Sequence, residues 1–284
     1  MNTNKFEKDI LVSMVVYGTK ADEIKEVIDF MNLENLNLSY NFLIIDNLGS
    51  SELSAFCKTI QNENIEYLYP GNNVGFGCGH NIAAKHFSNI HHRTHLILNP
   101  DVYISDECIR KIYGFINADE NISIVSPKLL NEDGSVQNIC RLLPSVGSLI
   151  KRFINKIFSI NRFNIEDKFN LVKKPTEVPS MHGACFFVNS DFFKSANGFD
   201  EIYFLYVEDI DLCRKLNKYG KIIFYPEFSA IHKHAKGSYK NLKLFRYHFV
   251  SFFNYFLKWG FVLDSDRKKI NKRAIEKIKL LAVE

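Results

Sequence analysis

Short apolar runs alternate with amphipathic stretches along the first half of the chain. The runs have the length and the β-branched content of strands and lie at residues 10–17, 42–45, 65–69, 96–98 and 122–125. Between them, apolar residues recur at helical spacing at residues 21–36, 50–60 and 105–116. This alternation predicts an α/β domain with a doubly wound, largely parallel sheet.

The second half of the chain has a less regular pattern. Residues 142–172 show little periodicity and predict an irregular insertion that is basic and aromatic. Strands are expected at residues 184–188, 222–225 and 228–231, with Pro226 between the last two, and helices at residues 208–219 and 267–281. Gly220 is expected to end the first of these helices. Aromatic residues crowd the segment 242–259.

Composition and charge narrow the class of protein. The 284 residues are 46% hydrophobic and 24% charged, as in a soluble globular protein. Six scattered cysteines without a CxxC pair, a polar N-terminus and no apolar run of spanning length predict a cytoplasmic protein with reduced thiols. Residues 240–284 carry 11 Lys and Arg against 4 Asp and Glu. This basic tail favours an anionic surface as partner, and we expect no nucleic-acid binding.

Two acidic residues follow strands of the predicted sheet. Asp101 comes after the run at 96–98, which Asn99-Pro100 ends because proline donates no ladder hydrogen bond. Asp46 ends the run at 42–45. Ligands bind at the carboxyl edge of open α/β sheets, so Asp101 could hold a divalent cation against phosphates and Asp46 could bind a base or ribose. The alternatives are a loop acid for Asp101 and a helix-capping neighbourhood for Asp46.

Three further segments contain residue types that suit a site. Residues 71–81 are glycine-rich and precede a helix, but their spacing matches neither the P-loop nor the dinucleotide motif. Glu208 and Asp209 belong to the densest acidic cluster, which suits either a general base or the first turn of a helix. His232 and His234 follow the last short strand, and each could be a metal ligand or a structural residue.

Taken in order, these segments resemble family 2 glycosyltransferases, most of all bacterial rhamnosyltransferases of O-antigen and cell-surface polysaccharide assembly. The resemblance spans about residues 10–260 and rests on Val15-Val16-Tyr17, Asp46-Asn47, Asn73 to Asn81, Leu98 to Asp101, Gly183-Ala184, Gly198 to Glu201, Glu208 to Leu212, His232 to Ser238 and Ser251 to Gly260. It implies the GT-A fold, in which helices flank a mostly parallel, nucleotide-binding sheet. Residues 1–235 would form the catalytic domain, with a nucleotide-sugar half at 10–125 and an acceptor half at 126–235. Residues 236–284 would form a basic, aromatic, helical extension.

The resemblance also implies roles for individual residues. Asp46 would recognise the nucleotide base, and Asp101 would bind the metal where the family has its Asp-x-Asp motif, with Asn99 in place of the first acid. Asp209 would be the general base beside Glu208, and His232 a further metal or diphosphate contact. The implied donor-binding residues are Val16, Tyr17, Asp46, Asn47, Asn73, Gly75, Gly77, Asn81 and Asn99, and the acceptor-side residues are Gly183, Asp200 and Asp211.

The implied reaction is an inverting transfer of a sugar from a nucleotide-diphospho-sugar, with Mg²⁺ or Mn²⁺ at the diphosphate and no covalent enzyme intermediate. L-Rhamnose from dTDP-rhamnose is the expected sugar, and a lipid-linked or polysaccharide hydroxyl the expected acceptor. Such an acceptor implies a peripheral protein at the inner face of the cytoplasmic membrane, with aromatic residues of 249–259 and basic residues of 267–273 on lipid.

Alternatives stay open for the extension and for the function. The aromatic residues could instead pack on the catalytic domain or on the second subunit of a homodimer. The chain could also be a nucleotide-sugar-binding or nucleotidyl-transfer protein, or a non-catalytic membrane-surface scaffold on a transferase fold.

Overall fold

The computed structural model describes residues 6–157, 165–233 and 242–281. Its strands are β1 (Lys8–Val16), β2 (Tyr40–Asp46), β3 (Ile65–Leu68), β4 (His92–Leu98), β5 (Val102–Tyr103), β6 (Ile122–Leu130), β7 (Cys140–Arg141), β8 (Thr176–Glu177), β9 (Ser180–Met181), β10 (Cys185–Asn189) and β11 (Lys221–His232). Its α-helices are α1 (Ala21–Met31), α2 (Ser51–Thr59), α3 (Phe76–His86), α4 (Asp106–Ala118), α5 (Val146–Ile157), α6 (Ser190–Ser195), α7 (Glu208–Leu216), α8 (Leu242–Trp259) and α9 (Ser265–Leu281), and its 3₁₀ helices are η1 (Leu33–Asn35) and η2 (Ile165–Leu171).

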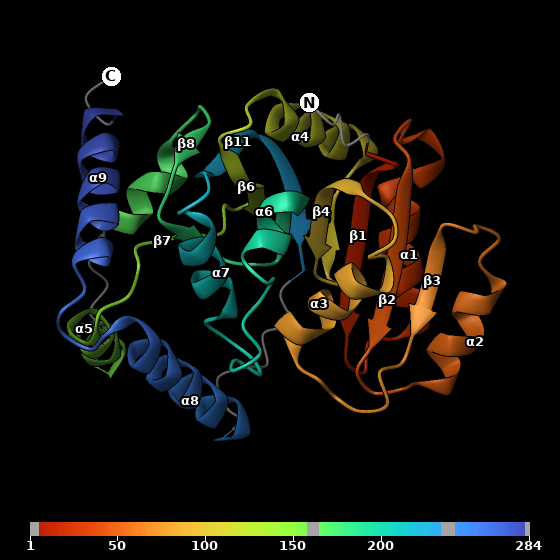
Figure 1. Ribbon diagram of the computed structural model, residues 1–284, viewed down its shortest axis with the longest axis horizontal. Coiled ribbons are helices and arrows are strands. Elements are labelled where there is room, and N and C mark those ends of the chain that lie inside the picture. The colour runs from red at the N-terminus through yellow and green to blue at the C-terminus, as the bar shows by residue number, and fades with distance from the viewer. Residues whose placement is uncertain (1–5, 158–164, 234–241, 282–284) are drawn as a thin grey trace.

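A mixed sheet runs through the centre of the molecule, in the order β3-β2-β1-β4-β10-β6-β11-β5, with β8 also paired to β11 (Figure 1). β3, β2, β1 and β4 are parallel, as the alternating pattern predicts. β10 lies antiparallel between β4 and β6. The two halves of the chain therefore share one sheet, and residues from both can reach the same edge.

Helices cover both faces of the first half of the sheet. Ile10, Val12 and Met14 of β1 belong to a core cluster with α1, whereas Leu11 and Val15 belong to a second cluster with the end of α3. A strand with no solvent side is apolar at consecutive positions, which explains the sequence of β1. All six cysteines are free and four are buried. The ends of the strands are the accessible part of this sheet.

β4 ends at Leu98, as the sequence predicts. Asn99 N donates a hydrogen bond to the Ala184 carbonyl at 2.9 Å, and Val102 N donates to the Asn99 carbonyl at 3.2 Å, so the chain turns at Pro100. Because β4 lies between β1 and β10, this turn emerges at the middle of the carboxyl edge.

Several predictions for the second half were wrong. Residues 146–157 form helix α5 inside the segment expected to be irregular. The helix expected at 208–219 ends at Leu216, so Gly220 is not its cap. The two strands expected around Pro226 are a single strand, β11, whose pairing with β6 shifts register between Tyr225 and Ser229. Residues 226–228 have no partner in that pairing, so the missing N–H of proline costs no ladder hydrogen bond.

The helix expected at residues 21–36 is also shorter than predicted. It ends at Met31, because Asn32 adopts a left-handed conformation with φ 47° and the chain continues as a 3₁₀ turn.

The C-terminal helices pack on the sheet domain through α7. Tyr255 and Phe256 of α8 are buried in a cluster with Tyr203 and Val207. Arg214 of α7 donates to the two carboxylate oxygens of Asp264, just before α9, at 2.8 and 2.5 Å. The predicted domain boundary at 235/236 lies outside the described residues and stays a prediction. Within the described ranges, every helix is too short or too polar to cross a membrane.

Candidate active site

A cleft of about 820 Å³ opens at the carboxyl edge of the sheet. Seven residues predicted for the donor or the metal line it: Val16, Tyr17, Asn47, Asn73, Gly75, Asn99 and Asp101. Seven more were not predicted: Val15, Phe76, Pro100, Phe204, Leu205, Leu244 and Tyr247. Leu244 and Tyr247 belong to α8, so the C-terminal helix forms part of the wall. The volume and the mixed lining are those of a small-molecule site.

Asp101 and His232 lie side by side because β5 pairs with the end of β11. His232 Nε2 is 3.3 Å from Asp101 Oδ1. The Gln137 amide donates to the His232 carbonyl at 2.9 Å, and its Oε1 lies 2.8 Å from His232 Nδ1, so Nδ1 must carry the proton that Oε1 accepts. His232 Nε2 therefore faces the carboxylate oxygen, to which a protonated ring donates directly and with which an unprotonated Nε2 can share a cation.

The residues at this point fit a divalent cation. Asn99 Oδ1 is buried and accepts no hydrogen bond from any described residue. Oxygen and imidazole ligands suit Mg²⁺ or Mn²⁺, which complete their coordination with substrate phosphates and water. In the described part of the chain, no three His, Cys, Asp or Glu side chains are grouped to hold a metal. The site therefore suits a cation that binds together with a diphosphate. His234, the other predicted ligand, lies outside the described residues.

Two asparagines shape the glycine-rich loop. Asn47 donates to the Gly75 carbonyl at 3.1 Å and accepts from Val74 N at 3.3 Å, while Asn73 accepts from Gly75 N at 3.0 Å. Gly75 has φ +86°, and a Cβ there would lie 2.3 Å from the Phe204 carbonyl oxygen, so only glycine fits. α3 begins at the next residue, Phe76, and its N-terminus favours an anionic ligand in the cleft.

Three residues predicted to bind the donor do not line the cleft. The buried Asp46 carboxylate accepts from Leu48 N, Ser50 N and the Tyr67 hydroxyl at 2.9, 2.6 and 2.9 Å. Asn81 exchanges hydrogen bonds of 2.9 and 2.8 Å with the Phe199 backbone. At Gly77, a Cβ would lie 2.8 Å from Phe199 Cβ. These residues hold the loops around the cleft in place, and their direct contact with a donor stays a prediction.

Asp209 contacts the segment that precedes β10, and neither Asp209 nor Gly183 is among the residues that line the cleft. The Asp209 carboxylate accepts from Gly183 N at 3.0 Å and from Ile210 N at 2.8 Å. Ala184, which follows Gly183 in the chain, accepts a hydrogen bond from Asn99 N. A Cβ at Gly183 would lie 2.9 Å from Asp209 Cβ, so glycine is needed for this approach. The structure thus connects Glu208-Asp209 to the Asn99–Asp101 turn through Gly183-Ala184.

Glu208 is buried next to Asp209. Its Oε2 accepts no hydrogen bond from a described residue, and burial raises the pKa of its carboxyl well above the usual range, with a further rise from the charge of Asp209. The preceding backbone is strained, with φ of 71° at Tyr206 and 72° at Val207, a conformation that β-branched residues rarely adopt. Such strain persists where function fixes a geometry, and here it directs the first turn of α7 at Gly183.

Asp200 and Asp211, predicted on the acceptor side, bind the C-terminal extension. Lys258 of α8 donates to Asp200 at 2.6 Å and to Asp211 at 2.8 Å, and Trp259 Nε1 donates to Asp211 at 2.6 Å. Asp211 is fully buried and neither residue lines the cleft. Their placement favours a structural role, and contact with an acceptor stays a prediction.

Sequence reasoning missed two kinds of functional residue. Gln137, which orients His232, is neutral and stands in no motif, so nothing in the sequence marks it. Tyr247 and Leu244 lie in the aromatic segment that the sequence did single out, but only the folded position of α8 places them in the cleft.

No profile of a known protein family matches the chain. It is 28% identical over 221 residues to the low-salt glycan biosynthesis hexosyltransferase Agl10 of Haloferax volcanii, a match that covers 76% of this chain and 66% of Agl10. It is 27% identical over 254 residues to the rhamnosyltransferase WbbL of Escherichia coli, covering 87% of this chain and 92% of WbbL. The N-acetylglucosaminyl-diphospho-decaprenol L-rhamnosyltransferase of Mycobacterium tuberculosis is 24% identical over 205 residues, covering 68% of this chain and 66% of that relative.

Solved structures show the same fold. GalNAc-T7, crystallised with UDP, GalNAc and Mn²⁺, has a TM-score of 0.58 and 15% identity, with 82% of this chain and 45% of that chain covered. The mannosyltransferase PcManGT of Pyrobaculum calidifontis, in complex with GDP-Man and Mn²⁺, has a TM-score of 0.55 and 14% identity, with 83% and 59% covered. This chain has the sequence and the fold of a glycosyltransferase. The GT-A fold that the motifs implied is confirmed, and the glycosyltransferase spans about two thirds of the length of the Agl10 and mycobacterial relatives.

Proposed function

We propose that this glycosyltransferase is an inverting enzyme that moves L-rhamnose from dTDP-rhamnose to a hydroxyl group of a lipid-linked or polysaccharide acceptor. One observation carries the proposal: Gly183-Ala184, just before β10, binds the Asp209 carboxylate on one side and, on the other, the turn after β4 that lines the cleft. A proton acceptor next to a diphosphate site is what a single displacement at the anomeric carbon requires. The names of Agl10, WbbL and the mycobacterial relative support hexosyl transfer and, more narrowly, rhamnosyl transfer.

The donor would lie along the cleft with its diphosphate near Asp101. The loop that Asn47 and Asn73 shape and the N-terminus of α3 would bind phosphate oxygens. Tyr17, which is 61% exposed at the end of β1, offers a flat ring for the base. Asp101, His232 and Asn99 would hold Mg²⁺ or Mn²⁺, which when bound neutralises the charge of the leaving diphosphate.

Asp209 would take the proton of the acceptor hydroxyl as that oxygen attacks the anomeric carbon from the face opposite the diphosphate. Its hydrogen bonds from Gly183 N and Ile210 N fix the direction of the carboxylate. Because the raised pKa keeps Glu208 protonated to a higher pH than an ordinary carboxyl, it adds little negative charge next to Asp209. One displacement inverts the anomeric carbon and needs no nucleophilic side chain.

A second cavity supports an amphiphilic acceptor. It measures about 420 Å³, is lined by Ile202, Phe204, Arg246, Tyr247, Val250 and Ser251, and shares Phe204 and Tyr247 with the cleft. Its lining is mostly apolar, with one guanidinium, and Arg246 has no partner among the residues that the structure describes. This combination suits an apolar chain joined to a phosphate, as in a lipid-linked saccharide. With that acceptor, the protein would work peripherally at the inner face of the cytoplasmic membrane, and a homodimer stays a prediction.

The test follows dTDP release from dTDP-L-rhamnose, with and without a synthetic N-acetylglucosaminyl-diphospho-lipid. Asp209→Asn keeps the shape of the side chain and removes proton acceptance, so the transfer rate should fall about 10²- to 10⁴-fold. The affinity for dTDP with Mn²⁺, measured by calorimetry, should change little.

The matched control is Asp22→Asn, which removes one exposed carboxylate from α1 and should leave both the transfer rate and the dTDP affinity unchanged. Unchanged transfer in Asp209→Asn would refute its role as base. A loss of dTDP affinity in that variant would place Asp209 in the donor site instead. A protein that binds dTDP but releases none from the donor would be a nucleotide-sugar-binding protein or a scaffold.

A further inference from the structure

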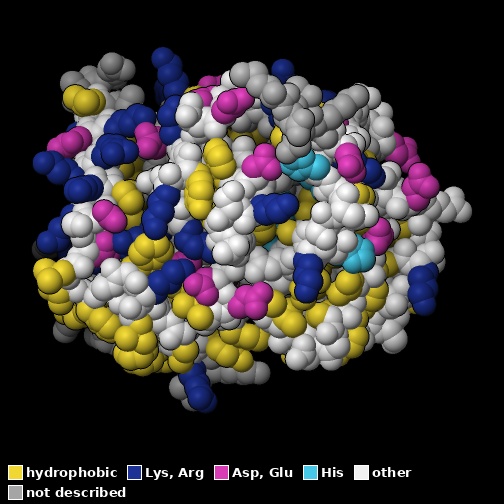
Figure 2. All heavy atoms as spheres, viewed as in Figure 1, with side chains coloured by type: hydrophobic (Ala, Val, Ile, Leu, Met, Phe, Trp, Pro, Cys, Tyr) yellow, Lys and Arg dark blue, Asp and Glu magenta, His cyan; other side chains and the backbone are white. Residues whose placement is uncertain are grey.

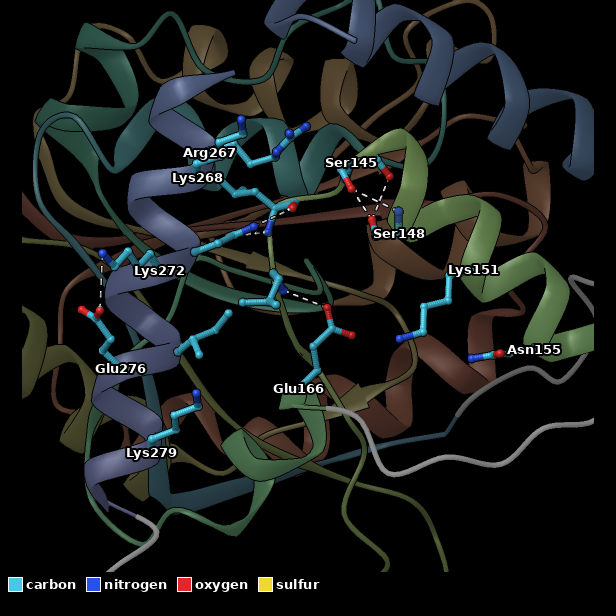
Figure 3. A pocket seen from close by; sticks show the side chains of 14 residues that line it. Ser145, Ser148, Lys151, Asn155, Glu166, Arg267, Lys268, Lys272, Glu276 and Lys279 are labelled. Atoms are coloured by element: carbon cyan, nitrogen blue, oxygen red, sulfur yellow. Dashed lines mark hydrogen bonds and ion pairs between the residues drawn. The ribbon is translucent and has the colours of Figure 1, made fainter. Parts of the chain in front are cut away.

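A further cavity, of about 690 Å³, lies apart from the cleft and from the 420 Å³ cavity beside it. It is bounded by α5, α9 and the segment 142–145 (Figure 3). Its charged lining residues are Lys151, Glu166, Arg267, Lys268, Lys272, Glu276 and Lys279. The proposed transfer reaction uses none of them. This basic cleft therefore needs an explanation of its own.

The walls of the basic cleft are fixed by hydrogen bonds to the segment 142–145. Asn271 of α9 accepts from Leu143 N at 2.9 Å and donates to the Leu143 carbonyl at 2.9 Å. Leu142 N donates to the buried Glu166 at 2.9 Å, and the buried Arg267 donates to the Pro144 carbonyl at 3.4 Å. Arg267 and Glu166 are therefore parts of the wall. The spacing between α5 and α9 is set before any ligand binds.

The positive charge inside the basic cleft is only partly neutralised. Lys272 lies 3.8 Å from Glu276, and Figure 3 shows it turned toward that carboxylate. The ammonium group of Lys151, which reaches from α5 into the space between the helices in Figure 3, has no hydrogen bond or ion pair with a described residue, nor have those of Lys268 and Lys279. Three ammonium groups spread along one cleft, without such partners, favour anionic oxygens as their ligands.

An exposed apolar surface adjoins the basic cleft through α5 and the C-terminal helices. Ile150 and Ile154 of α5 are exposed next to the cleft residues Lys151 and Asn155. On α8, every fourth residue along one stripe is exposed and apolar, and the chain between α8 and α9 exposes three more. This apolar ridge consists of Ile150, Ile154, Phe245, Phe249, Phe253, Leu257, Phe261, Val262 and Leu263, the last 89% exposed.

The ridge and the basic cleft form one continuous region. Val146 and Leu149 of α5 pack in the same cluster as Phe252 and Phe256 of α8, and the Phe253 and Phe261 rings meet at 5.9 Å. In Figure 2, hydrophobic side chains gather along the lower left edge, over α5 and α8, and Lys and Arg side chains gather beside them over α9. An exposed apolar patch of this extent marks an interaction surface.

We propose that this region binds a membrane, with the phosphate of an anionic phospholipid in the basic cleft and the apolar ridge in the interface. A soluble phosphate compound would use the lysines but would leave the exposed aromatic residues without a purpose. A bilayer supplies phosphate groups for the lysines at its surface and hydrocarbon for the apolar ridge beneath that surface. The aromatic rings of the ridge are of the kind that gather at this interface.

The lipid-facing residues differ from those that the sequence predicted within 249–259 and 267–273. Arg267 and the aromatic residues Phe256 and Trp259 pack within the protein, whereas Lys151, Ile150 and Ile154 of α5 join the surface. Binding to lipid requires no sugar transfer, so its outcome is independent of the proposed enzymatic activity.

Co-sedimentation of the full-length protein with vesicles tests the proposal. The vesicles contain phosphatidylcholine alone or mixed with phosphatidylglycerol. The cleft variant combines Lys151→Gln, Lys268→Gln and Lys279→Gln, and the control variant combines Lys58→Gln, Lys85→Gln and Lys111→Gln, three exposed lysines outside the region. Since a basic residue near an anionic surface contributes about 1 kcal/mol, the cleft variant should lose about 10²-fold in partitioning to phosphatidylglycerol. The control variant should lose much less.

A ridge variant, Val262→Ser with Leu263→Ser, should weaken binding to both kinds of vesicle while the protein stays folded by circular dichroism. If the cleft and control variants lose vesicle partitioning equally, the binding depends only on net charge, which would overturn the proposal. Binding of inorganic phosphate by the wild type but not by the cleft variant, measured by calorimetry, with no vesicle binding by the wild type, would reassign the cleft to a soluble anion. A wild-type dimer that the ridge variant dissociates, without vesicle binding, would assign the ridge to a second copy of the chain.

Discussion

At the scale of single residues, the site is defined by groups that are unfavourable where they stand. Asp101 Oδ1 lies 3.3 Å from His232 Nε2, and both Asp101 Oδ1 and Asn99 Oδ1 are buried without a described hydrogen-bond donor. Glu208 is a buried carboxyl whose Oε2 lacks a described hydrogen-bond partner. Folding alone gains nothing from such arrangements, so they favour a ligand or a reaction that uses them.

Removing Asp101 should abolish metal dependence and leave the fold intact. Asp101→Ala deletes a carboxylate at a strand end outside the core, so the free energy of unfolding should change by less than about 0.5 kcal/mol. Titration of the wild type with dTDP should show tighter binding with Mn²⁺ and loss of that gain with a chelator. The variant should show no gain, whereas Asp22→Ala should behave like the wild type. Undiminished Mn²⁺ dependence in Asp101→Ala would contradict the site.

Glu208 should make stability depend on pH. Burial, and then the charge of Asp209, raises its pKa well above the ordinary 4.5, so between 4.5 and the raised value the folded state binds the proton and the unfolded state does not. The free energy of unfolding should therefore fall as the pH rises through this window. Glu208→Gln stays neutral and should remove this component of the slope in urea unfolding measured from acid to alkaline pH. If the free energy of unfolding falls with pH at the same slope in the variant and the wild type, Glu208 does not contribute to the pH dependence.

At the scale of elements, close approach of backbones decides the shape of the site. The loop before α3 passes the segment around Phe204, and Phe76 N donates to the Phe204 carbonyl at 3.1 Å. Gly183, two residues before the antiparallel β10, likewise lies against the first turn of α7. Both contacts join segments far apart in sequence, and each depends on a glycine at the point of contact.

Gly75→Ala should test this contact against a matched glycine. Gly71 and Gly75 both have positive φ, at +91° and +86°, but a Cβ meets the Phe204 carbonyl only at Gly75 and meets nothing within 4 Å at Gly71. Both variants should lose about 1–3 kcal/mol from backbone strain. Gly75→Ala should lose more, because a backbone carbonyl cannot move aside, and should also weaken dTDP binding. Equal melting temperatures and equal affinities for the two variants would show that the contact is unimportant.

At the scale of the whole molecule, the C-terminal helices complete the wall of the cleft and pack on the sheet domain. α8 supplies Leu244 and Tyr247 to the cleft, and Lys258 and Trp259 to the buried Asp211. The Arg214 guanidinium lies 4.1 Å from the Trp259 ring centre and pairs with Asp264 where both side chains are 3% exposed. Cleft, sheet and extension should therefore unfold together.

Asp264→Ala should destabilise this junction strongly. It leaves Arg214 buried without its carboxylate partner, which costs about 3–5 kcal/mol, and it removes the acceptor for Arg267 N at 3.0 Å in the first turn of α9. Thermal unfolding and dTDP affinity report the loss. Asp266→Ala removes an exposed acid two residues later and should be nearly neutral. Replacing both partners, Arg214→Met with Asp264→Leu, should recover part of the stability that Asp264→Ala loses. If it recovers none, the unpaired Arg214 is not the cause of that loss.

The sequence determined the local structure of the first half. The period of its apolar residues placed five strands and three helices, and prolines and turn formers marked where strands end, because these signals act within a few residues. That was enough to put Asp46 and Asp101 at the carboxyl edge and, through ordered motifs, to predict the fold.

Only the tertiary structure decided which of these residues meet. The segment before β10 links Asp209 to Asn99, β11 brings His232 to Asp101, and α8 adds Tyr247 to the wall of the cleft. It also turned Asp211 toward Lys258 and Asp46 toward its own loop, where sequence alone suggested ligand contacts. β11 continues past Pro226 because its partner β6 leaves those residues unpaired. Strand pairing and helix docking depend on contacts across the chain, and periodicity within a segment carries no information about them.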